Sequence, residues 1–129
     1  LQGLRVLIVD DTQDAREWLV HVLSDFGARV LPASSVREAL DAVEREPPDI
    51  VVSDIRLPDE DGYDLIRKLR ALDLEHGRHT PAVALTAYPR VEDRARALAA
   101  GYEMHVPKPV EPSALAAVIA SVAGRGPEA

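Results

Sequence analysis

Several polar side chains of this chain stand directly at the ends of short apolar runs, and their types could perform chemistry together. They are, in chain order, Asp10, Asp11, Asp54, Thr86 and Lys108. Clustered carboxylates repel one another unless a cation lies between them, and a set of oxygen ligands suits Mg²⁺. A carboxylate can also act as a nucleophile and form an aspartyl phosphate, provided that positive charge neutralises the phosphoryl oxygens. These residue types therefore indicate magnesium-dependent phosphoryl transfer, with Mg²⁺, Lys108 and the Thr86 hydroxyl supplying that neutralisation.

The elements that must position these residues alternate along the whole chain. Apolar, β-branched runs predict strands at 6–9, 28–31, 50–52, 82–86 and 104–106. Amphipathic patterns predict helices over 15–26, 36–43, 62–69, 90–100 and 113–122. Strictly alternating strands and helices predict a parallel sheet with right-handed crossovers and helices on both faces. Because ligands bind at the carboxyl ends of such strands, the five polar residues are expected along one edge.

Length and composition exclude several classes of protein. The chain has 129 residues, no cysteine and a net charge of −7, so thiolate sites and a basic nucleic-acid surface are excluded. No apolar run approaches the roughly 20 residues that cross a bilayer, and neither a signal peptide nor a linker is evident. We expect a single cytoplasmic domain over 1–129, with a core from about 4 to 123 and a frayed tail at 124–129.

Other polar and aromatic residues have plain structural interpretations. Trp18 lies at helical spacing with apolar neighbours, so we expect it in the core or at its edge. The acidic run 59–61 is interpreted as a solvated turn that attracts cations weakly. The histidines outside the strands are expected on the surface: His21, His76 and His79. His105 is expected to be a partly exposed residue of the last strand, with a pH-sensitive switch as the alternative.

The polar residues and their surroundings resemble the receiver domain of two-component response regulators. The matching segments are Asp10-Asp11 after RVLIV, Asp54 in DIVVSDIRLPDEDG, Thr86 in AVALTA and Lys108 in HVPKP. The resemblance extends from about Leu4 to Val122. It implies a flavodoxin-like (βα)5 fold of three layers, in which a parallel sheet of five strands has the order 2-1-3-4-5.

The resemblance also implies a role for each matching residue. Asp54 corresponds to the phosphoacceptor, and Lys108 to the lysine that pairs with the phosphoryl oxygens; the bond from Lys108 to Pro109 would be cis. Thr86 corresponds to the switch hydroxyl. The implied Mg²⁺ ligands are Asp10, Asp11, Asp54 and the backbone carbonyl of Arg56. Pro58 and Gly62 match the loop that leads from the third strand into the third helix.

One position departs from the commonest receiver pattern. Many receivers have tyrosine or phenylalanine three residues before the lysine, where this chain has His105. A tyrosine-type rotamer switch is therefore in doubt, and His105 is the candidate switch residue in its place. The side chains of Arg56 and Tyr88 are candidates for modulating the lifetime of the phosphoryl group. Histidine at this position, together with the abrupt start at Leu1, suggests the receiver of a hybrid sensor histidine kinase.

The resulting hypothesis is a phosphoacceptor domain of a phosphorelay that takes a phosphoryl group from a histidine kinase or phosphotransfer domain. The domain itself is not expected to be an enzyme beyond its own phosphorylation. Output would pass to a downstream protein through the fourth helix, fifth strand and fifth helix, with no direct contact to nucleic acid or membrane. Two alternatives stay open: an aspartate-nucleophile phosphatase and a pseudo-receiver that only binds a protein. A dinucleotide-binding site is excluded because no G-x-G-x-x-G follows the first strand.

Overall fold

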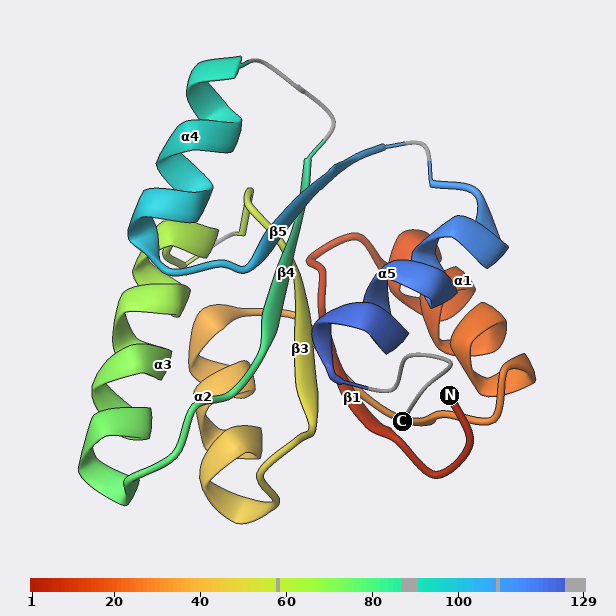
Figure 1. Cartoon of the computed structure of the whole chain (residues 1–129), viewed down its shortest axis with the longest axis horizontal. Helices are drawn as coiled ribbons and strands as arrows, with labels where there is room; N and C mark the ends of the chain where they lie inside the picture. Colours follow the sequence, from red (N-terminus) through yellow and green to blue (C-terminus); the bar gives the residue numbers. More distant parts are fainter. Residues whose placement is uncertain (58, 87–90, 109, 125–129) are drawn as a thin grey trace.

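Parallel strands in the order β2-β1-β3-β4-β5 form the central sheet of the protein, which we analysed as a computed structural model (Figure 1). The structure describes residues 1–57, 59–86, 91–108 and 110–124, and of residues 91–93 it describes the backbone. The strands are β1 Arg5–Val9, β2 Arg29–Ala33, β3 Ile50–Asp54, β4 Ala82–Thr86 and β5 Met104–Pro107. The helices are α1 Gln13–Asp25, α2 Val36–Arg45, α3 Gly62–His76, α4 Val91–Ala100 and α5 Pro112–Val122. The predicted flavodoxin-like fold and its strand order are confirmed.

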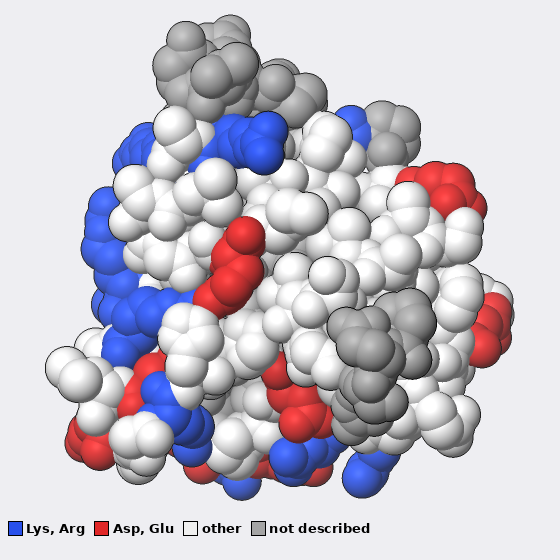
Figure 2. Space-filling view, in the orientation of Figure 1, with Lys and Arg blue, Asp and Glu red and all other residues white. Residues whose placement is uncertain are grey.

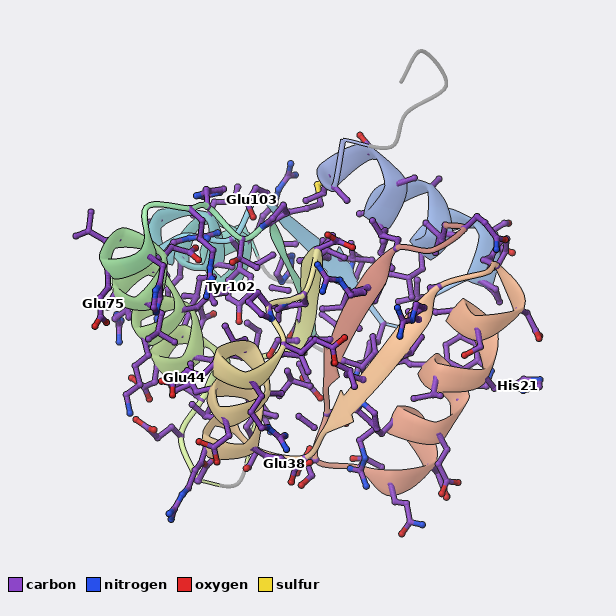
Figure 3. All side chains as sticks on the ribbon, turned by 90° about the horizontal axis from the view of Figure 1, so that it is seen from below. His21, Glu38, Glu44, Glu75, Tyr102 and Glu103 are labelled. Carbon is purple, nitrogen blue, oxygen red and sulfur yellow. The ribbon has the colours of Figure 1, made fainter. Side chains whose placement is uncertain are left out.

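Helices cover both faces of the sheet and make three layers. Helices α2, α3 and α4 lie on one face, and α1 and α5 lie on the other, as Figures 1 and 3 show from two directions. Side chains alternate along a strand, so β1 sends Leu7 and Val9 into the first core layer and Val6 and Ile8 into the second. This two-sided burial explains why the central strands are continuous apolar runs.

The predicted helix starts and stops correspond to observed caps. Ser35 caps α2 by accepting the amide of Glu38, and Asp61 forms a capping box with Asp64 at the start of α3. Gly27 and Gly101 follow α1 and α4 with positive φ, which glycine adopts without strain. The third helix was predicted too short. It was expected over 62–69, whereas α3 continues to His76.

Two aromatic residues of the predicted first helix are exposed. Trp18 in α1 is 44% exposed, and Phe26, which directly follows α1, is 40% exposed. The layer between α1 and the sheet is filled by Leu19 and Leu23. Helical spacing alone cannot show how far a core layer extends toward the helix edge; of the two positions expected for Trp18, the core and its edge, the structure shows the edge.

The two outer strands of the sheet each contain a proline. Pro32 lies in β2 beside Ile8 of β1, and Pro107 ends β5 beside Thr86 of β4. The predicted second strand, 28–31, stopped short of Pro32, whereas β2 continues to Ala33. Proline is tolerated in a sheet chiefly on such edge strands. Among the described residues, no helix is long and apolar enough to span a membrane.

Some sequence-based expectations fall on residues that the structure leaves undescribed. Pro58 of the acidic loop, Tyr88 after β4 and Pro109 after Lys108 lie outside the described residues. The proposed modulating role of Tyr88 and the cis bond before Pro109 therefore stay predictions. The division into one domain with a frayed tail also stays a prediction, since residues 125–129 lie outside the described part of the chain.

Candidate functional site

Three carboxylates meet at the carboxyl edge of the sheet. Asp10 and Asp11 directly follow β1, and Asp54 is the last residue of the neighbouring strand β3. Asp10 is buried, Asp54 is half-buried and Asp11 is exposed, and one oxygen from each lies within 4.8 Å of the others. The parallel pairing of β1 with β3 produces this cluster, because it ends both strands at the same level.

Asp10 is held in place by several hydrogen bonds. Its carboxylate accepts the amide of Thr12 at 2.9 Å, and its backbone carbonyl accepts the Arg16 guanidinium at 2.8 Å. Its amide donates to the carbonyl of Ala33 in β2 at 3.0 Å. A buried carboxylate costs free energy unless it is paired and hydrogen-bonded, and this arrangement meets that requirement while keeping one oxygen toward the cluster.

Lys108 joins two of the carboxylates. Its Nζ donates to Asp54 Oδ2 at 3.0 Å and to Asp10 Oδ2 at 3.2 Å. Burial alone would lower the pKa of Lys108, but the hydrogen bond to Asp54 and the charges of Asp54 and Asp10 raise it above the usual lysine value. Lys108 therefore stays protonated. Three carboxylates against one ammonium leave an excess of two negative charges, which favours a divalent cation.

Of the remaining predicted groups, Thr86 and Arg56 lie at the same carboxyl edge of the sheet, whereas His105 lies further back, beside Ala84 of β4. Thr86, the last residue of β4, is buried, and its carbonyl accepts the amide of Lys108 at 2.7 Å. The exposed residue Arg56 donates its amide to Asp54 Oδ1 at 3.3 Å, so the chain turns back over the Asp54 carboxylate. His105 is half-buried in β5, as expected of a strand residue at the edge of the sheet.

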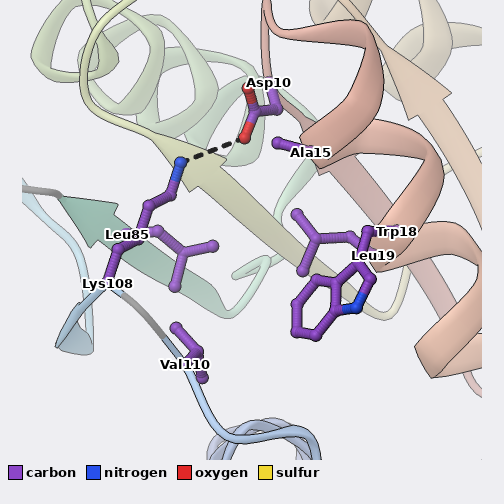
Figure 4. Close-up of a pocket in the computed structure, with 7 residues that line it drawn as sticks. All are labelled: Asp10, Ala15, Trp18, Leu19, Leu85, Lys108 and Val110. Carbon is purple, nitrogen blue, oxygen red and sulfur yellow. Dashed lines mark hydrogen bonds and ion pairs between the residues drawn. The ribbon is translucent and has the colours of Figure 1, made fainter.

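A cavity of about 580 Å³ opens beside the carboxylate cluster. Its polar end is the ion pair of Asp10 and Lys108, and Figure 4 shows Trp18 on the opposite side. The rest of the lining is apolar and comes from α1, β4 and the segment before α5: Ala15, Leu19, Leu85 and Val110. Trp18 is thus exposed on the wall of this cavity, which adjoins the carboxylate cluster. Spacing along α1 gave no signal for this position.

The acidic loop has more structure than the sequence interpretation allowed. Asp59 accepts the amides of Val36 and Arg37 at 3.0 and 3.1 Å, at the N-terminus of α2. Glu60 pairs with Lys68 at 2.6 Å, and Asp61 caps α3. Burial alone would raise the pKa of Asp59, but the two amides lower it. The interpretation of 59–61 as a merely solvated turn is therefore wrong, because two of its acids complete helix ends.

The surface histidines are placed as expected. His21 and His76 are exposed, and His79 is an exposed residue whose ring contacts the carboxylate of Glu103. Figure 3 shows His21 projecting outward from α1. None of these three belongs to the described site.

Comparison with known proteins agrees with this fold and site. Residues 6–120 match the family described as the response regulator receiver domain. A 14.6 kDa protein of Leptolyngbya boryana is 45% identical over 112 residues, which cover 87% of this chain and 84% of that protein. The sensor histidine kinase GacS of Pseudomonas protegens is 34% identical over 96% of this chain, and the match spans 14% of the kinase.

One similar solved structure contains a magnesium ion. The receiver domain of a sensor histidine kinase from Pseudomonas aeruginosa, with a magnesium ion coordinated in its active site cleft, has a TM-score of 0.85 to this chain. It is 32% identical, and the match covers 95% of this chain and 98% of that one.

The chain belongs to the response regulator receiver domain family of two-component signalling. Receiver domains are signalling modules rather than classical enzymes, and they interact with histidine kinases or phosphotransfer domains. The buried and half-buried carboxylates at the strand ends fit a Mg²⁺ ion, because that ion prefers hard oxygen ligands and tolerates water in its remaining positions.

Proposed function

We propose that Asp54 accepts a phosphoryl group from a phosphohistidine of a partner histidine kinase or phosphotransfer domain. The observation that carries this proposal is the contact of one lysine, Lys108, with both Asp54 and Asp10 at 3.0 and 3.2 Å. Acceptor, acidic pair and cation thus lie side by side, as phosphoryl transfer requires. The groups that would hold Mg²⁺ are Asp10, Asp11, Asp54 and the backbone carbonyl of Arg56.

The reaction is a transfer between two side chains. A carboxylate oxygen of Asp54 bonds to phosphorus while the phosphorus–nitrogen bond of the phosphohistidine breaks, and the bonding electrons leave with the imidazole. Lys108 would support the negative phosphoryl oxygens, and Thr86, at the end of the neighbouring strand β4, would supply a hydroxyl donor to them. A bound Mg²⁺ would neutralise further charge on these oxygens.

The cavity beside Lys108 supports an approach of the donor from the side of α1. A phosphohistidine must come close to Asp54, and the cavity opens beside Lys108, which contacts Asp54. Trp18, Leu19 and Val110 offer an apolar wall next to the ion pair of Asp10 and Lys108 (Figure 4). We infer that this wall contacts the donor.

Output would pass through the face formed by α4, β5 and α5. Leu98 of α4 and Met104 of β5 are large apolar residues that are exposed, as a protein-binding surface requires. Figure 2 shows basic side chains on the left, over α3 and α4, and α4 carries the exposed residues Arg94 and Arg96. Thr86 and His105 are the proposed switch residues between the acceptor and this face. Cytoplasmic location and an origin in a hybrid kinase stay predictions.

The acceptor role is tested with a small acyl phosphate as donor in the presence of Mg²⁺. Asp54→Asn should abolish incorporation of labelled phosphate, because an amide is not a nucleophile, while Asp25→Asn on exposed α1 should be labelled like the native chain. The label on the native chain should be lost in alkali, as expected of an acyl phosphate. Labelling of Asp54→Asn would contradict the proposal. Repeated turnover of a simple phosphomonoester would instead indicate a phosphatase.

A further inference from the structure

Tyr102 is a buried tyrosine whose hydroxyl reaches the segment that carries the acceptor. It lies between α4 and β5 and is 3% exposed. Its hydroxyl donates to the backbone carbonyl of Gly62, the first residue of α3, at 2.7 Å. Ser53, which precedes Asp54, lies near this hydroxyl. Figure 3 shows Tyr102 inside the layer between the sheet and the helices α3 and α4.

Gly62 and Ser53 mark the two ends of the acceptor segment. The Ser53 hydroxyl donates to the Asp54 carbonyl at 2.8 Å, and the Gly62 amide donates to the Ile55 carbonyl at 2.6 Å. A Cβ placed on Gly62 would lie 2.8 Å from the carbonyl oxygen of Asp54 and from Cα of Ile55. The start of α3 therefore lies directly against the acceptor backbone, and the Tyr102 hydroxyl fixes the α3 side of this close approach through the Gly62 carbonyl.

The backbone around Tyr102 is itself fixed. The Tyr102 amide donates to the Ala97 carbonyl at the end of α4, and the Glu103 amide donates to the Ala82 carbonyl of β4. The carbonyl of Gly101 accepts the guanidinium of Arg70 at 2.7 Å. Burial raises the pKa of Tyr102 well above its ordinary value, so the hydroxyl remains a donor at neutral pH.

We propose that Tyr102 is a positioning residue for phosphorylation, which holds the acceptor segment in its metal-binding geometry and ties it to the end of α4. This inference rests on the proposed function, because it assigns Tyr102 a role in the same reaction. The segment between Asp54 and Gly62 contains the Arg56 carbonyl, one of the proposed Mg²⁺ ligands. Fixing the entry to α3 limits the positions open to that carbonyl, and groups that orient metal ligands affect metal affinity.

The test of this proposal removes the Tyr102 hydroxyl and keeps the aromatic ring. Tyr102→Phe should raise the dissociation constant for Mg²⁺ by about tenfold, the lower end of the loss expected for a group that orients ligands. Trp18 is the single tryptophan of the chain and lines the cavity beside Asp10, so its fluorescence can follow the titration. Phosphorylation by a small acyl phosphate should slow mainly at low Mg²⁺ and recover at saturating Mg²⁺.

A matched control separates positioning from general stability. Thr80→Val also removes a buried hydroxyl, which donates to Asp73 at 2.7 Å at the opposite end of β4. It should lower the urea midpoint by a similar amount and leave Mg²⁺ affinity unchanged. Equal Mg²⁺ affinity in Tyr102→Phe and the native chain, or equal weakening in both variants, would overturn the proposal. Absence of labelling in the native chain would instead refute the proposed function itself.

Discussion

Asp73 is a buried carboxylate that has no part in the proposed reaction. It accepts the amide and hydroxyl of Thr80 at 2.9 and 2.7 Å, and the guanidinium of Arg70 at 2.8 Å. Burial alone would raise the pKa of Asp73, but these bonds from Thr80 and Arg70 lower it below its usual value. Ionised Asp73 therefore stabilises the junction between α3 and β4.

This lowered pKa predicts a particular pH dependence of stability. A carboxyl with a lower pKa in the folded state contributes fully above its unfolded pKa of about 3.9, and the contribution is lost as pH falls through the folded value. Asp73→Asn should lower the free energy of unfolding at neutral pH by about 2 kcal/mol. Urea unfolding from pH 6 to pH 2.5 should show a shallower loss in the variant than in the native chain.

The matching control for this measurement is Asp25→Asn, which changes an exposed carboxyl of α1. It should leave both the neutral stability and the acid slope near those of the native chain. An unchanged acid slope in Asp73→Asn would contradict the assignment.

At the scale of residues, the sequence predicts groups that stand at strand ends but not those that depend on distant partners. Asp10, Asp54 and Lys108 could be found because the end of a buried strand is visible as the end of an apolar run. Tyr102 and Asp73 gave no such signal, since their partners Gly62 and Thr80 are recognised only once the chain is folded. The exposure of Trp18 likewise depends on how α1 lies beside Val110 and Lys108.

The N-terminus of helix α2 is stabilised by a residue from another segment of the chain. Besides its own cap at Ser35, its first amides, from Val36 and Arg37, donate to Asp59, which is 23 residues away from Val36 along the chain. A carboxylate at a helix N-terminus both satisfies free amides and complements the helix dipole. The acidic loop after β3 is thereby fastened to α2.

We expect Asp59→Ala to destabilise the protein by about 1 kcal/mol, the usual effect of losing a helix cap. Hydrogen exchange of the Val36 and Arg37 amides should accelerate more than exchange in the middle of α2. Glu44→Ala, on the exposed side of the same helix, should change neither quantity. Unchanged exchange at both amides in Asp59→Ala would show that Ser35 alone holds the helix start.

At the scale of elements, local chemistry decided which predictions succeeded. The starts of α2 and α3 were predicted because Ser35 and Asp61 cap their own helices within one turn. Strand β4 was predicted with the bounds that it has, since a buried β-branched run ends at Thr86. Strand β2 was predicted too short because a proline such as Pro32 usually ends a strand. Pro32 is tolerated within β2 because β2 lies at the edge of the sheet.

At the scale of the whole molecule, part of the net negative charge is concentrated in the site. The chain has a net charge of −7, and three of its carboxylates lie within 4.8 Å of one another. Without a cation, that repulsion opposes folding, so the arrangement that suits Mg²⁺ lowers stability in its absence. The stability of the whole domain should therefore depend on the magnesium concentration.

Binding to the folded state alone stabilises a protein by about 2.7 kcal/mol when the ligand is at a hundred times its dissociation constant. Thermal unfolding of the native chain should shift upward accordingly with Mg²⁺. Asp11→Asn removes one of the repelling charges, so it should be more stable than the native chain without Mg²⁺, by about 1 kcal/mol. The same variant should lose most of the shift with Mg²⁺. A native chain whose unfolding temperature ignores Mg²⁺ would contradict the metal assignment.

The prolines of the two outer strands affect whether the sheets of separate molecules can pair edge to edge. A sheet edge can act as a template on which strands of other molecules add, and this is a route to aggregation. Pro32 on β2 and Pro107 on β5 each remove one amide from an edge strand, so both open sides of the sheet are poor templates. The fold therefore disfavours edge-to-edge joining of sheets from separate copies of the domain.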